Sequence, residues 1–214
     1  MPQIQQQFVD LALQMGALKF GEFTLKSGRV SPYFFNAGML ANGRAASALG
    51  KAYAQAIATH HQDVDVVFGP AYKGIPLAAL AAAALSDHHS IDVPYAFDRK
   101  EAKDHGEGGV IVGGPLQGKV VIVDDVMTAG TAIRHSVEMI REAGAEVSGI
   151  VISLDRQEKG TGDLSASQEV ERTTGVTVTA IATLADLVTH LETKGAENGH
   201  LDRVLAYRDQ YGVN

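Results

Sequence analysis

A pair of adjacent aspartates, Asp124 and Asp125, is the strongest indication of chemistry in this sequence. The pair follows four apolar residues, Val120 to Val123, which predict a strand buried on both faces of a sheet. In open α/β sheets, ligands bind at the carboxyl ends of such strands. Small and hydroxylated residues at 128–131 then lead into a predicted helix, whose first N–H groups suit a phosphate. Because two carboxylates can accept hydrogen bonds from a vicinal diol, the segment predicts a site for ribose 5-phosphate.

Each half of this segment also has a purely structural interpretation, because two aspartates can simply end a strand and a threonine can cap a helix. The combination is more specific, and it lacks both the Gly-Lys-Thr of a Walker loop and the glycine pattern of a dinucleotide fingerprint. It resembles the phosphoribosyl pyrophosphate (PRPP) signature of the type I phosphoribosyltransferases. The resemblance implies that the aspartates contact the ribose hydroxyls and that the loop holds the 5-phosphate. The residues concerned are Asp124, Asp125, Val126, Met127, Thr128, Ala129, Gly130, Thr131 and Ala132.

A second predicted strand ends at Gly69, and Tyr72 and Lys73 lie in the turn before an alanine-rich helix. A lysine in a turn is usually just solvated. Its place at a second strand end favours a functional interpretation, because neighbouring strand ends share the same edge of a sheet. The turn resembles the pyrophosphate loop of the same family, which implies that Tyr72 and Lys73 bind PRPP.

Four basic residues, Arg99, Lys100, Lys103 and His105, lie close together in an otherwise acidic chain. They lead into residues 101–109, EAKDHGEGG, whose polar and glycine-rich composition predicts a mobile surface loop. A charge run is usually a solvated face, but cations on a loop that closes over a ligand suit the departure of pyrophosphate. The stretch resembles the catalytic loop of the orotate phosphoribosyltransferases. The resemblance implies that the four residues bind PRPP and that Lys103 is catalytic, as are Asp124 and Asp125.

The segment 23–36, FTLKSGRVSPYFFN, contains Lys26 and the adjacent Phe34 and Phe35. Neighbouring strand residues point to opposite faces, so at least one phenylalanine is expected to pack in the core. In the orotate phosphoribosyltransferases a similar segment lines the base pocket. This implies that the two phenylalanines contact orotate and that Lys26 binds PRPP near the reaction centre as a catalytic residue.

Arg156 follows a further predicted strand, in the stretch SLDRQEKG. Its alternative interpretation is an ordinary surface arginine. It is similar to the arginine that faces the orotate carboxylate in the orotate phosphoribosyltransferases, and the resemblance implies that Arg156 and Thr128 complete the orotate site.

The elements that would hold these segments alternate between strand and helix from residue 64 onward, the pattern of parallel strands joined by crossover helices. Strands are predicted at 64–69, 93–97, 119–125 and 147–154, and helices at 74–87 and 131–145, followed by a strand–helix unit at 176–194 and a final helix at 198–211. Residues 161–174 show no motif. In the first sixty residues, a helix is followed by short extended pieces and then by a helix at 43–60, a pattern that predicts a small cap.

The predicted fold class is therefore α/β, and the resemblance implies the type I phosphoribosyltransferase fold. This is a central, mostly parallel sheet flanked by helices, with a small N-terminal cap or hood. We expect a single domain over residues 1–214, in which residues 1–40 contribute a base-binding cap.

Composition excludes several classes of protein. The chain has 214 residues, no cysteine and a net charge of −7, which rules out disulfides and thiolate sites and opposes nonspecific binding of nucleic acid. Its longest apolar run, 75–85, is far shorter than the roughly 20 residues that span a bilayer. The N-terminus lacks the features of a signal peptide. We expect a cytoplasmic protein that binds neither nucleic acid nor membrane.

The resemblance implies transfer of ribose 5-phosphate from PRPP to orotate in pyrimidine (UMP) biosynthesis, by a homodimer with shared active sites. Mg²⁺ is expected as a cofactor held mainly by substrate oxygens, because a departing pyrophosphate develops charge. Two alternatives stay open: another type I phosphoribosyltransferase, acting on a purine or uracil, and a non-catalytic PRPP-sensing regulator. The regulator should carry a basic helix-turn-helix, and none is visible.

Overall fold

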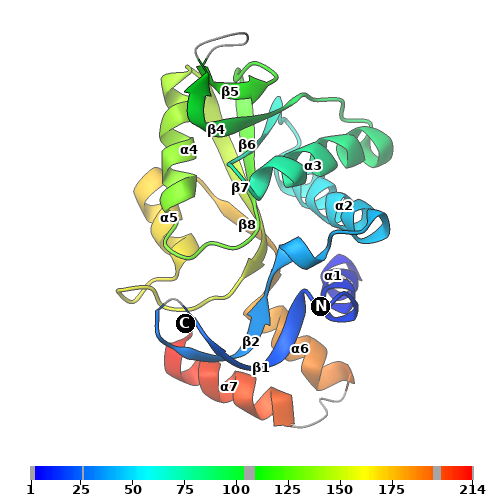
Figure 1. Cartoon of the computed structure of the whole chain (residues 1–214), viewed down its shortest axis with the longest axis vertical. Coiled ribbons are helices and arrows are strands. Elements are labelled where there is room, and N and C mark those ends of the chain that lie inside the picture. Colours follow the sequence, from blue (N-terminus) through cyan, green and yellow to red (C-terminus); the bar gives the residue numbers. More distant parts are fainter. Residues whose placement is uncertain (1–2, 26, 104–108, 195–198, 214) are drawn as a thin grey trace.

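The computed structural model describes residues 3–25, 27–103, 109–194 and 199–213, with the backbone alone at 100–103 and 109. Its centre is a six-stranded sheet with the strand order β5-β4-β3-β6-β7-β8 (Figure 1). All neighbouring strands are parallel except β4 and β5, which are antiparallel. The strands are β3 (Val66–Gly69), β4 (Tyr95–Lys103), β5 (Gly109–Gly113), β6 (Lys119–Asp124), β7 (Glu146–Asp155) and β8 (Val178–Thr183). The prediction of a central, mostly parallel sheet is confirmed.

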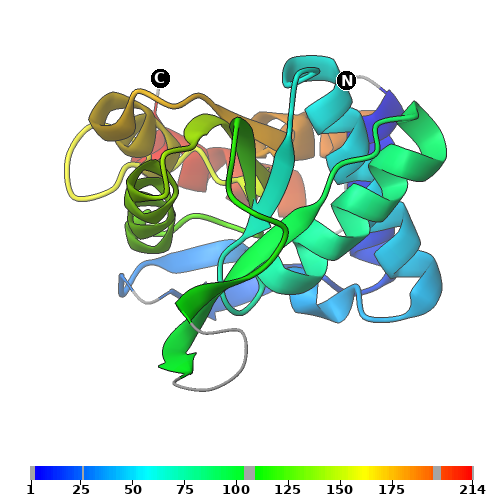
Figure 2. The ribbon, with the colours of Figure 1, turned by 90° about the horizontal axis from the view of Figure 1, so that it is seen from above.

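Helices cover both faces of this sheet. Helices α2 (Gly43–His60) and α3 (Gly74–His89) lie on one face, and α4 (Thr131–Glu142) and α5 (Ala166–Thr174) on the other, as Figure 2 shows from above. The four apolar residues of β6 alternate between the two cores: Val121 and Val123 pack with the core that contains α2 and α3, while Val120 and Ile122 pack with α4 and α5. Covering both faces explains why the strand is apolar without alternation.

The N-terminal residues form a second, smaller layer. Helix α1 (Gln3–Gln14) leads into strands β1 (Leu18–Thr24) and β2 (Val30–Phe35), which pair antiparallel in a separate two-stranded sheet, and a 3₁₀ turn, η1 (Ala37–Met39), follows. In Figure 1 this hairpin lies beside α6 (Leu184–Lys194) and α7 (His200–Tyr211) at the foot of the molecule. The hairpin thus packs beside the C-terminal helices, and the sequence did not indicate this contact. Whether residues 1–40 act as a base-binding cap stays a prediction.

One prediction about local structure was wrong, and one helix was not predicted. Residues 101–103 and 109 were expected in a loop. They belong instead to the antiparallel strands β4 and β5, in which Lys103 lies opposite Gly109. The ladder satisfies backbone groups that a loop would leave to water. The helix that was not predicted is α5, which lies within residues 161–174 and begins with a capping box between Ser165 and Gln168. The spacing Ser-x-x-Gln is a readable start signal for a helix.

Candidate active site

The two aspartates lie where the sequence placed them, at the carboxyl end of the central strand β6. Oδ1 of Asp124 accepts a hydrogen bond of 2.9 Å from the backbone N–H of Asp125, and Oδ1 of Asp125 accepts one of 2.7 Å from that of Val126. The backbone oxygen of Asp124 accepts a further bond of 2.6 Å from the hydroxyl of Tyr53, on α2. These contacts hold the start of the loop, while each carboxylate keeps capacity to accept hydrogen bonds from a ligand.

The carboxyl group of Asp124 is unusually hard to ionise. Burial raises its pKa to about 6, and the nearby charge of Asp125 acts in the same direction, while the N–H bond from Asp125 opposes the rise. Perturbed carboxyl groups of this kind gather at functional sites, because a ligand can supply the compensation that water no longer does.

The loop after the aspartates surrounds a cavity of about 260 Å³ lined by Asp124 and residues 126–133. Gly130 adopts φ = 67° immediately before α4, and no side chain caps the first N–H groups of that helix. A Cβ atom at Gly130 would lie 2.4 Å from Cγ2 of Val170, on α5, so the loop is packed too closely there for a larger residue. Uncapped N–H groups at a helix N-terminus suit the phosphate that the sequence predicted.

The second predicted loop, after β3, reaches the same site. Nζ of Lys73 lies 2.5 Å from Oδ2 of Asp125, and the lysine side chain is 60 % exposed. The loop is held on its other side, where the N–H of Ala71 donates to Oδ1 of Asp98 at 2.6 Å, and the peptide bond after Ala71 is cis. Tyr72, in the same loop, is 66 % exposed. The strand ends of β3 and β6 therefore bring two predicted segments together.

The predicted basic residues are only partly described. Arg99 lies in β4, and its Nη1 is buried without a hydrogen-bond partner among the described residues. Lys26 and His105 lie outside the described residues, as do the side chains of Lys100 and Lys103. Their predicted roles stay predictions.

The predicted base-binding residues lie on β2 and after β7. Phe35 is buried near Phe8, with ring centroids 6.0 Å apart, whereas Phe34 is 40 % exposed and stacks on Phe23 at 5.5 Å. The expectation that at least one phenylalanine packs in the core is confirmed. Arg156 is not a surface arginine, because its side chain is 13 % exposed and forms an ion pair of 2.6 Å with Glu158.

Comparison with known proteins shows the family of this chain. A family model described as a phosphoribosyl transferase domain matches residues 37–179. Orotate phosphoribosyltransferases of Cronobacter sakazakii (strain ATCC BAA-894) and Vibrio atlanticus (strain LGP32) are 60 % and 57 % identical over 209 residues, covering 98 % of each chain. The crystal structure of the Francisella tularensis orotate phosphoribosyltransferase superposes with a TM-score of 0.87 at 42 % identity, covering 96 % of this chain and 99 % of that one.

This chain belongs to the orotate phosphoribosyltransferase family. The recognition from sequence and the predicted fold are thereby confirmed. For an orotate phosphoribosyltransferase, the joining of β3 and β6 through Lys73 and Asp125 places two segments of predicted PRPP contacts side by side. The cavity lined by residues 126–133 lies next to them, at the predicted 5-phosphate loop.

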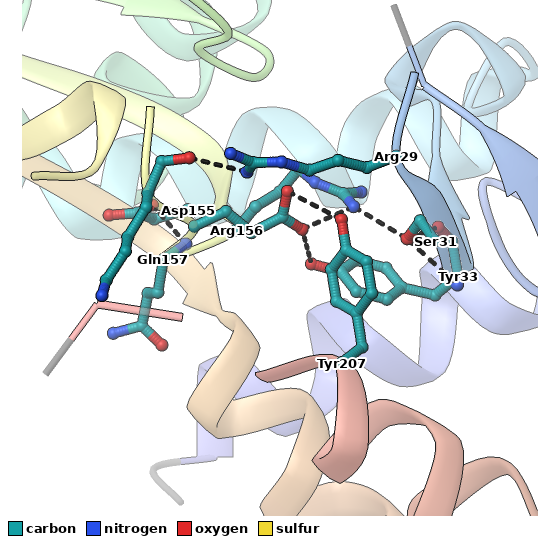
Figure 3. A network of polar contacts seen from close by, with 9 residues as sticks. Arg29, Ser31, Tyr33, Asp155, Arg156, Gln157 and Tyr207 are labelled. Atoms are coloured by element: carbon teal, nitrogen blue, oxygen red, sulfur yellow. Dashed lines mark hydrogen bonds and ion pairs between the residues drawn. The ribbon is translucent and has the colours of Figure 1, made fainter. Parts of the chain in front are cut away.

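Sequence patterns did not indicate the residues that surround Arg156. Its guanidinium lies 4.2 Å over the ring of Tyr33, and Nη2 donates to Oγ of Ser31 at 2.9 Å (Figure 3). Tyr33 and Tyr207 both donate to Glu158 at 3.1 Å. These residues carry no local spacing motif, and only their contacts reveal the group.

Two further observations bear on cofactors and setting. Within the described ranges, no group of three or more His, Asp or Glu side chains is placed to hold a metal ion. In the same part of the chain, no helix has the length and apolar character needed to cross a membrane.

Proposed function

We propose that this protein transfers ribose 5-phosphate from PRPP to orotate, which yields orotidine 5′-monophosphate and pyrophosphate for pyrimidine (UMP) biosynthesis. The observation that carries the proposal is the contact between Lys73 and Asp125, beside the cavity of the phosphate loop, in a chain up to 60 % identical to named orotate phosphoribosyltransferases. Two oppositely charged groups and a cavity at a helix N-terminus fit a donor that carries a diol, a 5-phosphate and a pyrophosphate.

Each part of the donor has a proposed partner. Asp124 and Asp125 accept hydrogen bonds from the ribose hydroxyls, and the N–H groups and hydroxyls of residues 126–132 bind the 5-phosphate. The pyrophosphate is bound by basic and hydroxyl side chains of the loops after β3 and around β4: Tyr72, Lys73, Arg99, Lys100, Lys103 and His105. The buried Nη1 of Arg99, which has no hydrogen-bond partner among the described residues, supports this assignment, because an anion would supply the acceptor that such a donor needs.

The chemistry rests on positioning and charge. As the bond to pyrophosphate breaks, the anomeric carbon becomes oxocarbenium-like and negative charge develops on the leaving group. Lys73 and Lys103 are proposed to stabilise that charge, and Lys26 is proposed to bind PRPP as a further catalytic residue. The nucleophile is a ring nitrogen of orotate that is readily deprotonated, so its proton passes to water and needs no dedicated protein base. As pyrophosphate leaves, this nitrogen bonds to the anomeric carbon, and the protein contributes by holding the two in line.

Mg²⁺ is proposed as the cofactor. The carboxylates of Asp124 and Asp125 are hard oxygen ligands that fit Mg²⁺ directly or through water, with most of its ligands supplied by phosphate oxygens of the donor. When bound, the ion neutralises charge on the departing pyrophosphate. The protein side chains orient the donor around it.

The base is proposed to lie against the backbone of Phe34 and Phe35, with its carboxylate facing Arg156 and with Thr128 completing the site. A guanidinium matches a carboxylate in shape and charge. Exposure of 13 % for the Arg156 side chain leaves room for a ligand contact at its edge.

The protein is further proposed to be a cytoplasmic homodimer with shared active sites, binding neither nucleic acid nor membrane. Some apolar side chains that the proposed ligand contacts do not use are 40 % to 54 % exposed, and a second copy of the chain would give them a partner: Val30, Met39, Tyr95 and Val110.

An absorbance assay tests the reaction. Loss of orotate is followed with PRPP and Mg²⁺, in parallel with reactions that contain adenine, hypoxanthine or uracil instead. Consumption of orotate in preference to the other bases is expected. Persistence of orotate while a purine or uracil is converted would show that the substrate assignment is wrong, and no turnover of any base would favour a PRPP-binding regulator.

A further inference from the structure

A nearly buried carboxylate, Glu158, lies where three segments that are distant in the sequence meet. Its side chain is 11 % exposed, and its Oε1 lies 2.6 Å from Nη2 of Arg156. The same oxygen accepts a hydrogen bond from the hydroxyl of Tyr33 on β2, and Oε2 accepts one from Tyr207 on α7. Figure 3 shows Arg156, Tyr33 and Tyr207 converging on one point. Glu158 thus connects the N-terminal hairpin, the end of β7 and the C-terminal helix.

The contacts of Arg156 explain why it needs this partner. Its guanidinium stacks on Tyr33 and is mostly shielded from solvent. When one member of a buried ion pair is removed, the remaining charge is left uncompensated and tends to leave its place. The arginine side chain is long and flexible enough to do so. The carboxylate of Glu158 therefore keeps the guanidinium in the interior and in one orientation.

The same contacts leave hydrogen-bonding capacity on Arg156. A guanidinium has five N–H donors. Nη2 serves both Glu158 and Ser31, while Nε is buried and has no hydrogen-bond partner in the described part of the chain. The ion pair and the hydrogen bond to Ser31 thus use the same nitrogen, and a ligand carboxylate would meet an arginine that is already oriented.

Glu158 is itself held firmly. Burial raises the pKa of Tyr33 well above its usual range, so its hydroxyl stays protonated and donates to the carboxylate. The backbone around Glu158 pairs with the end of the chain, where Lys159 N–H donates to the oxygen of Tyr211 at 2.8 Å and Val213 N–H donates to that of Gln157 at 2.9 Å. The position of the carboxylate is therefore set by both ends of the protein.

We infer that Glu158 is a positioning residue that presents Arg156 to the carboxylate of the base, and so contributes to the preference for a carboxylated pyrimidine. The inference rests on the proposed contact between Arg156 and orotate. Orotidine 5′-monophosphate and uridine 5′-monophosphate differ only in the carboxylate. Comparing their binding therefore distinguishes a failure of the inference from a failure of the proposed contact.

Calorimetric titration of the full-length protein with each nucleotide measures the preference as a ratio of Kd values. We expect Glu158→Gln to reduce the preference for orotidine 5′-monophosphate by about tenfold, which corresponds to losing one well-oriented hydrogen bond to a charged group. The affinity for uridine 5′-monophosphate should stay within about twofold, because this nucleotide lacks the carboxylate that Arg156 is proposed to contact. In turnover, the KM for orotate should rise while the KM for PRPP stays unchanged.

Two further variants make the test specific. Glu171→Gln is a matched control, because Glu171 also accepts a structural hydrogen bond, from Val178 N–H at 2.8 Å, but does not contact Arg156. It should leave the ratio unchanged. Tyr207→Phe removes one of the two hydroxyls that hold Glu158, so it should lower the ratio in the same direction by a smaller factor, and it decides the question if Glu158→Gln does not fold.

The outcomes are distinct. A ratio that is unchanged or larger in Glu158→Gln, or unchanged in Tyr207→Phe when only that variant folds, overturns the inference while the proposed function stands. A larger ratio would mean that Glu158 competes with the ligand for Arg156. A wild-type protein without any preference for orotidine 5′-monophosphate would overturn the proposed base contact, and this inference with it.

Discussion

The ammonium group of Lys73 lies 2.5 Å from Oδ2 of Asp125, so the loop after β3 and the end of β6 are joined by a direct ion pair. The two partners differ in environment, because the lysine side chain is 60 % exposed and that of the aspartate only 10 %. An ion pair with one exposed partner adds little to folding stability, typically about 1 kcal/mol or less. This small contribution to stability fits the proposed role of both residues in binding PRPP.

The first prediction follows from this contact. Lys73→Gln should weaken the binding of PRPP about tenfold to hundredfold, because a charged hydrogen bond to the pyrophosphate is lost. Combined with Asp125→Asn, the losses should not add, since the two side chains touch. Calorimetric titration of both single variants and the double variant measures the coupling. Lys51→Gln, on the exposed side of α2, serves as the control, and strictly additive losses would contradict the prediction.

The second prediction concerns the pH dependence of stability through Asp124. Its pKa of about 6 in the folded protein exceeds the ordinary 3.8, so the folded state binds the proton more tightly. This contribution to stability is complete below about pH 4 and is lost as the pH rises through about 6. Asp124→Asn should therefore match the wild type in acid and exceed its unfolding free energy by about 1 to 3 kcal/mol above pH 7.

Denaturant unfolding at several pH values tests this prediction. Asp92→Asn removes a carboxyl group at an exposed position, where no burial penalises the charge, and should show no such divergence. The same Asp124→Asn protein should bind PRPP more weakly, and the loss should be larger when Asp125→Asn is added. A stabilised double variant with unchanged PRPP affinity would remove the diol-binding role.

The third prediction concerns Gly130 in the phosphate loop. Gly130→Ala combines a left-handed backbone with a Cβ only 2.4 Å from Val170, so the loop must shift. Gly144→Ala is the matched control, because Gly144 also has a positive φ, of 84°, but no atom lies within 4 Å of the added Cβ. The control should cost about 1 kcal/mol from backbone strain alone, measured by thermal unfolding. Gly130→Ala should cost more and should also weaken PRPP binding, and equal effects of the two variants would argue against a packed loop.

The fourth prediction concerns the proposed dimer. Lys103→Ala removes a cation of the predicted catalytic loop and Asp125→Asn removes a diol contact, and each homodimer should be nearly inactive. If the loop of one subunit completes the site of its partner, a mixed dimer contains one site with both groups intact. Activity should return when the two variants are unfolded, mixed and refolded together. Heterodimers that are present but inactive would show that each loop serves its own subunit.

Much of the fold follows from patterns within short stretches of sequence. The helix predicted at 43–60 coincides with α2, and the buried strand predicted before Asp124 coincides with β6. Both predictions rest on hydrophobic periodicity or apolar runs, which are visible within a short stretch of sequence. The capping box at Ser165 was equally readable, although it was not used to predict α5. The pairing of β4 with β5 was less accessible, because a polar, glycine-rich stretch resembles a loop until its backbone finds a partner strand.

The sequence by itself determined the alternation of strands and helices from residue 64 onward, apart from β5 and α5, and the position of the aspartates at a strand end, since each depends on neighbouring residues. Only the tertiary structure decided that Phe35 is buried while Phe34 is exposed, and that Glu158 anchors Arg156. Glu158 is separated from Tyr33 by 125 residues and from Tyr207 by 49. No local spacing encodes such contacts, because they form only when the N-terminal hairpin and the C-terminal helix pack together beside the end of β7.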